Sequence, residues 1–196
     1  MMYTLEKFIL EFAPAGDCTL ENFIRPFISR NVIKQGGFLL RATDICEQLT
    51  FINQGICCRF NRGTGRDYVT GCYYDGELAG DYDGFTPYRP VHYYIRAIED
   101  LYVEQLSFSA IAMLTGLDPA FEQIFKTLAE YSYCKSIARA VSFQHTPDAK
   151  YLNLVEQRAD GIKRRPRSLI GPYLGIHAKD SDKAHPRLFH DSIIWS

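Results

Sequence analysis

The chain has 196 residues, of which 46% are hydrophobic, and its formal net charge at pH 7 is −1. This length suffices for one or two domains with hydrophobic cores, and the composition excludes an intrinsically disordered chain. No apolar run approaches the roughly 20 residues of a membrane-spanning helix, and the N-terminus lacks the layout of a signal peptide. We therefore expect a cytoplasmic globular protein with no membrane partner.

Two short helices are predicted at the N-terminus. Thr4 is placed to cap the first and Thr19 the second, and Pro26 should end or kink the second helix. Apolar residues recur at helical spacing in both, namely Leu5, Phe8, Ile9 and Phe12 in the first and Leu20, Phe23, Ile24 and Phe27 in the second.

Short strands separated by turn signals follow. The expected strands cover residues 31–34, 38–41, 48–53, 56–61, 67–74, 93–95 and 101–103. Asp75-Gly76 and Glu99-Asp100 are typical turn sequences, and Gly80 would allow the backbone to approach a ligand closely. Many short strands at regular spacing favour a jelly roll.

A short helix capped by Ser107 and a long helix beginning at Asp118-Pro119 come next. The long helix carries one apolar stripe, formed by Phe121, Ile124, Phe125, Leu128, Tyr131, Cys134, Ile137, Ala138 and Val141. This stripe is longer than one β-roll needs to cover itself. Two alternatives stay open, which are pairing with a second copy of the helix and packing within its own chain.

Six cysteines occur, and no two of them have the C-x-x-C spacing. Cys57 and Cys58 lie in a strand, where neighbouring side chains point to opposite faces. We expect reduced, partly buried thiols. The histidines of the C-terminal part, His177, His185 and His190, fit no metal-ligand spacing, and no catalytic set of residues is recognisable. The sequence therefore predicts no metal, no cofactor and no enzymatic activity.

The segment Gly76-Glu77-Leu78-Ala79-Gly80-Asp81 and the later Ala97 resemble the ligand cassette of the Crp-Fnr family of regulators. That cassette reads Gly-Glu-x-x-Gly-Glu and, after a loop, Arg-Ser-Ala-x-Val-x-Ala. Residues 34–40 and 49–59 are similar to two further blocks of the same family, Lys-x-Gly-x-x-Leu and Phe-Ile-x-x-Gly-x-x-Arg.

The resemblance implies an α+β fold in three parts. Residues 1–116 would form a cyclic-nucleotide-binding-like jelly roll with N-terminal helices. Residues 117–144 would form the dimerisation helix, with contacts from Ile124, Leu128, Tyr131 and Ala138. Residues 145–196 would form a small winged helix-turn-helix domain that binds DNA.

The resemblance also implies a ligand site, lined by Gly80, Asp81, Tyr82, Arg89, Val91, His92 and Tyr93. Val91 occupies the place of the family's phosphate-binding arginine, and a cyclic phosphate needs a charge-assisted partner. We therefore expect no tight binding of cyclic AMP, and the effector is not identified. In the alternative interpretation the pocket is empty, or the side chains of Tyr88, Tyr93 and Tyr94 fill it.

The C-terminal part of the chain is mildly basic. From His145 onward it holds nine Lys or Arg and six Asp or Glu, a net charge of +3, which is consistent with a polyanionic partner. The predicted phosphate contacts are Arg164, Arg165, Arg167, Lys179 and Lys183. Residues 168–176 resemble the start of the family's helix-turn-helix, including its Tyr-Leu-Gly-Ile turn.

The similarity stops in one step at Ile176, because the recognition-helix pattern is missing after it. Natural divergence and a shifted reading frame are both open explanations. Residues 177–186 can be encoded so that skipping one base yields TPKTLTRHIR, which has the cap, the inward Leu and Ile and the arginines of a recognition helix. The sequence thus predicts a dimeric, effector-sensing transcriptional regulator. The alternative is a sensor or interaction module that has lost DNA binding.

Overall fold

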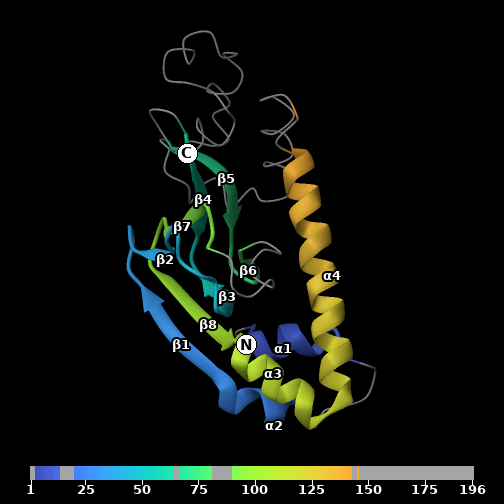
Figure 1. Cartoon of the computed structure of the whole chain (residues 1–196). Helices are drawn as coiled ribbons and strands as arrows, with labels where there is room; N and C mark the ends of the chain where they lie inside the picture. Colours follow the sequence, from blue (N-terminus) through green and yellow to red (C-terminus); the bar gives the residue numbers. More distant parts are fainter. Residues whose placement is uncertain (1–2, 14–19, 64–66, 81–89, 143–144, 146–196) are drawn as a thin grey trace, which may run out of the picture.

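Two antiparallel sheets form a β-roll, and the long helix α4 runs along one side of it (Figure 1). The computed structural model describes residues 3–13, 20–63, 67–80, 90–142 and 145. The helices are α1 (Leu5–Leu10), α2 (Leu20–Ile24), the 3-10 turn η1 (Arg25–Phe27), α3 (Phe108–Leu117) and α4 (Pro119–Ser142). The strands are β1 (Ile28–Ile33), β2 (Phe38–Leu40), β3 (Gln48–Gln54), β4 (Cys57–Arg62), β5 (Asp67–Tyr73), β6 (Leu78–Ala79), β7 (Tyr93–Ala97) and β8 (Leu101–Ser107).

The order of the strands confirms the predicted jelly roll. One sheet runs β1-β8-β3-β6 and the other runs β2-β7-β4-β5, and every predicted strand is present within a few residues of its expected bounds. The two-residue strand β6 is too short to show the alternation that marks a strand in a sequence, and it was not predicted. Side chains from both sheets meet inside the roll, where the buried cluster comprises Ile52, Cys57, Tyr73, Val91, Tyr93, Ile95, Ala97, Leu101 and Val103.

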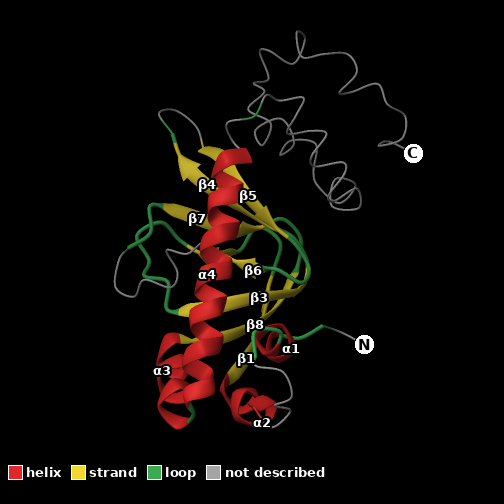
Figure 2. Ribbon diagram, turned by 90° about the vertical axis from the view of Figure 1, so that its right-hand side faces the viewer, coloured by secondary structure: helices red, strands yellow, loops and turns green. Residues whose placement is uncertain are grey.

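A second core lies outside the roll, where the helices pack against the outer face of β3 and β8. In Figure 2, α4 crosses the strands, and α1, α2 and α3 gather around its N-terminal end. The buried cluster joins residues of these helices to Leu49, Phe51 and Leu106 of the sheet. Ile124 and Leu128 are both 0% exposed here. Both are therefore core residues of the protomer, which corrects their predicted role at a dimer interface.

The remainder of α4 meets much less of its own chain. Tyr131 is 38% exposed, although its ring still contacts Phe8 and Phe12, at centroid distances of 6.1 and 5.4 Å. Further along the helix, Ile137 and Val141 are 48% and 49% exposed. The apolar stripe of the helix thus changes its surroundings between residues 128 and 137.

The caps of the helices agree only in part with prediction. The side chains of Ser107 and Asp118 accept hydrogen bonds from the amides of Ala110 (3.1 Å) and Ala120 (2.8 Å), as expected. The Thr4 hydroxyl makes no capping bond to α1, which corrects its predicted role.

A distant carboxylate takes the place of that hydroxyl. Glu104 Oε2 of β8 accepts the Leu5 amide at 2.7 Å and a bond from Asn53 Nδ2 at 3.1 Å, while Glu104 Oε1 accepts one from Arg30 Nε at 2.9 Å. The Glu104 residue is only 3% exposed, so this carboxylate is a buried anchor between α1 and the sheet.

The cysteines also differ from expectation. Cys58 and Cys72 form a disulfide, where reduced thiols were predicted. These residues lie directly opposite each other in the β4–β5 pair, with their Cα atoms 4.1 Å apart. The pairing register of β4 and β5 places the two cysteines opposite each other. Their spacing along the sequence does not predict this contact.

Two features are absent from the residues that the structure describes. Within this part of the chain, no helix is long and apolar enough to cross a membrane. The same residues contain no group of three or more His, Cys, Asp or Glu side chains that could hold a metal ion.

Candidate effector site

A pocket of about 470 Å³ opens between the two sheets at one end of the roll. Leu40 and Ile95 of the second sheet form an apolar part of its wall. Thr50 and Gln105 of the first sheet line it as well, together with residues 44–48 of the preceding loop. Its volume lies within the range of small-molecule sites.

The polar wall of this pocket is held by hydrogen bonds. Gln105 Nε2 donates to Thr50 Oγ1 at 3.1 Å, and Gln105 Oε1 accepts a bond from Asn31 Nδ2 at 2.6 Å. These bonds fix the orientation of the Gln105 amide at the pocket wall, so the pocket has one preorganised polar side.

Among the predicted ligand-binding residues within the described ranges, Gly80 is the one that lines this pocket. It follows β6 with φ +114°, a conformation that strongly favours glycine, and a Cβ there would meet nothing within 4 Å. The positive φ, and not a lack of space for a side chain, therefore explains why a glycine occupies this position. Asp81, Tyr82 and Arg89 lie outside the described residues.

Val91 lies in the apolar interior and is only 5% exposed. Its amide donates to the Asp44 carbonyl at 3.0 Å, and its carbonyl accepts from the Thr43 amide at 2.8 Å. The valine is thus a core residue of the roll and brings no charge to the site. His92, which follows it, is exposed.

Tyr93 and Tyr94 point to opposite faces of β7. Tyr93 belongs to the buried interior, which agrees with the alternative interpretation that tyrosine side chains fill the pocket. Tyr94 stacks on Phe60 with the ring centroids 5.1 Å apart and donates to Asp67 Oδ2 at 2.6 Å. Burial, together with the bond to Asp67, raises the pKa of Tyr94 to about 12. Tyr94 therefore does not fill the interior, and Tyr88 lies outside the described residues.

Two arginines near the interior were not among the predicted site residues. The Arg59 guanidinium lies 4.9 Å from the centroid of the Tyr93 ring, and the Arg139 guanidinium of α4 lies 4.4 Å from that of Tyr73. The sequence did contain a signal that Arg59 faces the interior. It stands two positions after the inward Cys57 on a predicted strand, so the two side chains share a face. No sequence pattern connects Arg139 to β5.

No family model matches the sequence, and no curated protein matches it. Solved structures do match. FixK2 from Bradyrhizobium japonicum aligns with a TM-score of 0.62 and 15% identity, over 83% of this chain and 84% of FixK2.

Two further structures are similar. The global regulator CLP from Xanthomonas campestris, described as responsive to c-di-GMP, has a TM-score of 0.58 and 14% identity, over 85% of this chain and 89% of CLP. The fold is that of the Crp-Fnr regulators. A C-linker and cyclic-nucleotide-binding homology domain of zELK channels, crystallised in the presence of cAMP, has a TM-score of 0.53 and 17% identity, over 64% of this chain and 61% of the other. The Crp-Fnr-like β-roll described here thus shares its architecture with domains of different function.

Proposed function

We propose that the chain is a one-component transcriptional regulator of the Crp-Fnr type. The β-roll senses a small effector, α4 joins two protomers, and the C-terminal part binds a two-fold DNA site. The observation that carries this proposal is the likeness to FixK2 and CLP over more than four-fifths of this chain, which extends past the β-roll itself.

The exposed end of α4 supports the dimer. Cys134, Ile137, Ala138 and Val141 follow the i, i+3, i+4, i+7 spacing of one helix face, and all four are exposed. A face of this kind is an unfavourable surface for a protomer in water and a favourable one between two parallel helices. Of the predicted contact residues, Ala138 lies on this face, while Tyr131 precedes it on the same stripe, where its ring contacts Phe8 and Phe12.

DNA binding is the part of the proposal that depends most on residues outside the described ranges. Arg164, Arg165, Arg167, Lys179 and Lys183 are all there, as is the whole proposed domain of residues 145–196 apart from His145. Their proposed role rests on the sequence resemblance and on the local charge of +3.

A gel-shift experiment with fragments of the host genome at several salt concentrations tests the regulator. We expect a sequence-specific component above the salt-sensitive background. Replacing Arg164, Arg165 and Arg167 together by glutamine should weaken all binding and reduce its salt dependence. If every fragment binds equally at every salt concentration, the chain is not a sequence-specific regulator.

The second candidate is a sensor or interaction module without DNA binding, favoured by the missing recognition-helix pattern after Ile176. Resequencing the gene distinguishes divergence from a frame shift. A codon string whose skipped-base frame lacks the inward Leu and Ile removes the frame-shift explanation. If the frame is shifted, the corrected protein should bind DNA well and the printed chain weakly.

A further inference from the structure

We propose that the pocket between the two sheets takes a small organic cation, an amine that also carries a carbonyl group and an apolar side chain. Three parts of the pocket wall favour this chemistry, which are two carboxylates in the loop of residues 44–48, a buried hydroxyl on β3 and an apolar surface on the second sheet. The inference rests on the proposed effector-sensing function and names the chemistry of its ligand.

The charged side chains of the pocket lining are acidic. Asp44 and Glu47 contribute carboxylates, and none of the described lining residues is a lysine, an arginine or a histidine. Neither carboxylate takes part in an ion pair within the described part of the chain. A wall of this sign attracts a cation and repels an anion.

Hydrogen bonds hold the Asp44 carboxylate in place. Asp44 Oδ2 accepts the Arg41 amide at 3.0 Å, and the Asp44 carbonyl accepts the Val91 amide at 3.0 Å. The Arg41 guanidinium makes a cation–π contact, 4.1 Å from the centroid of the Phe38 ring. The Asp44 carboxylate therefore has a fixed position, and its Oδ1 atom accepts no hydrogen bond from the described residues.

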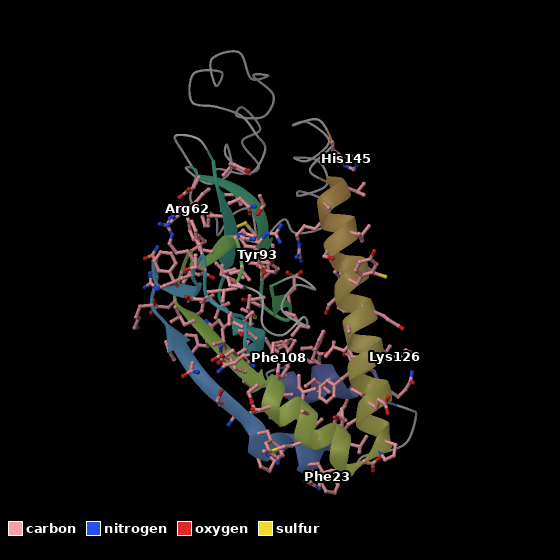
Figure 3. All side chains as sticks on the ribbon, in the orientation of Figure 1. Phe23, Arg62, Tyr93, Phe108, Lys126 and His145 are labelled. Carbon is pink, nitrogen blue, oxygen red and sulfur yellow. A yellow bond between two sulfur atoms is a disulfide. The ribbon has the colours of Figure 1, made fainter. Side chains whose placement is uncertain are left out.

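Glu47 is held at the same wall through its backbone. Its carbonyl accepts the Phe108 amide at 3.0 Å, which ties the loop to the start of α3, where Figure 3 labels Phe108. The carboxylate acts on the neighbouring thiol. Burial raises the pKa of Cys46, the bond to the Gln48 carbonyl lowers it, and the negative charge of Glu47 adds to the rise. Cys46 also lines the pocket, so the Glu47 charge acts on the pocket wall.

A buried hydroxyl lies on the inner wall. Thr50 of β3 is 5% exposed and pairs directly with Gln105 of β8. Thr50 Oγ1 accepts the bond from Gln105 Nε2, and Gln105 Oε1 accepts the one from Asn31. The direction of these bonds leaves the Thr50 hydroxyl hydrogen without an acceptor in the described part of the chain. An unused donor in a buried wall favours a ligand that places a carbonyl oxygen there.

The second sheet supplies the apolar wall. Leu40 and Ile95 are directly paired between β2 and β7, and both line the pocket, so they present one continuous apolar surface. The cassette position agrees with a pocket that rejects anions. Val91 stands where the Crp-Fnr cassette has its phosphate-binding arginine, and it is a buried apolar residue.

Thermal unfolding of the full chain with three leucine derivatives tests the proposal. At a pH of about 6.5, below the ordinary pKa of an α-amino group, leucinamide is a cation, N-acetylleucinamide is neutral and N-acetylleucine is an anion. All three carry a carbonyl group and the same side chain. The shift of the melting temperature with probe concentration gives each affinity. Ionic strength is equal and low, because salt screens exposed charges.

We expect leucinamide to bind about fivefold or more tightly than N-acetylleucine, with the neutral amide between them. Asp44→Asn combined with Glu47→Gln removes both charges and keeps an acceptor for the Arg41 amide. This variant should lose the preference for the cation. Glu122→Gln combined with Glu130→Gln is the matched control, because it removes the same charge from exposed positions of α4 and should keep the preference.

The hydroxyl is tested in the same assay. Thr50→Val should weaken binding of leucinamide and of the neutral amide about fivefold, and Thr50→Ser should restore it. An unchanged affinity in a folded Thr50→Val protein overturns the proposal. Should that variant fail to fold, the charge variants decide.

Three further results would overturn the proposal. They are no response of the wild type to any probe, an anion that binds as tightly as the cation, and a preference that survives the loss of Asp44 and Glu47. Gel shifts on the same preparations test DNA binding separately. Selective amine binding without DNA binding would refute the regulator alone, and the reverse result would refute the amine site alone.

Discussion

The helix α4 has two different kinds of neighbour along its length. In its first part, residues 119–128, the apolar side chains of Phe121, Ile124, Phe125 and Leu128 are at most 7% exposed, against α1, α3 and the first sheet. In its second part, residues 131–142, Ile137 and Val141 are about half exposed. In the sequence the two parts form one continuous apolar stripe. Periodicity in the sequence therefore identifies an apolar helix face. Only the tertiary structure shows whether the same chain or another molecule buries it.

The comparison predicts that truncations in the first part of α4 destabilise the protomer most. Leu128→Ala removes a fully buried side chain and should lower the free energy of unfolding by about 2–5 kcal/mol. Leu117→Ala is a matched control, because Leu117 is 62% exposed at the end of α3 and should change it by less than about 0.5 kcal/mol. Chemical denaturation measures both. Equal effects would mean that the first part of α4 does not pack as described.

The second prediction concerns the Glu104 carboxylate, which anchors α1 to the first sheet. Burial raises the pKa of Glu104, but the bonds from Leu5, Asn53 and Arg30 lower it, and the net pKa lies below the ordinary value. Glu104→Gln should cost about 1–3 kcal/mol at neutral pH, because it weakens charge-assisted bonds to a buried group.

The pH dependence of this loss follows from the lowered pKa. The charged carboxylate stabilises the fold above the unfolded-state pKa of about 4.3, and this contribution is lost as the pH falls through the folded-state pKa. Denaturation of both proteins between pH 7 and pH 3 should therefore show the difference shrinking in acid. A difference that stays constant over this range would contradict the role of the charge.

The third prediction separates the second part of α4 from the first. Ile137→Lys should leave the protomer folded, because the side chain is 48% exposed, and should convert a dimer into a monomer. Light scattering at tens of micromolar, about the range expected for a standard-sized interface, measures the mass. Met113→Lys is the control, since Met113 is 60% exposed on α3, away from the proposed face. A wild type that is itself monomeric at this concentration would refute the dimer.

The smallest effect on stability is expected from Cys134. This exposed thiol lies on the proposed dimer face, and a residue near a two-fold axis meets its own counterpart. Mild oxidation should therefore link two chains into a species that non-reducing electrophoresis resolves, with no loss of the folded state. Cys134→Ser should abolish that species. Its persistence in the variant would place the contact between protomers elsewhere.

The parts of the fold that depend on near neighbours were predictable from the sequence. Ser107 and Asp118 cap helices through amides two or three residues away, so their role can be read locally. The strands other than the two-residue β6 were also recognisable, because alternation and turn residues mark them. The cassette match also drew attention to Val91, which the structure shows as a buried, uncharged residue of the roll.

The remaining features depend on pairings between distant parts of the chain. The Cys58–Cys72 disulfide follows from the register of β4 and β5, and the approach of Arg139 to Gly71 follows from how α4 crosses the sheet. Neither contact produces a periodic pattern in the sequence. Of the predicted ligand-binding residues that the structure describes, Gly80, Val91, His92 and Tyr93, only Gly80 lines the pocket, because a cassette motif locates a loop and says little about which side chains from other elements face it.

The bond between Glu104 and the Leu5 amide joins residues 99 positions apart, and β1 likewise pairs with β8. Synthesis on the ribosome is directional, so the residues of α1 emerge long before the carboxylate that caps them. At roughly 5–20 residues per second the delay is about 5–20 seconds. During that interval the sheet under α1 lacks its central strand, because β8 lies between β1 and β3. Helix α1 is thus made well before it can be completed, and closure of β8 is the event that completes it.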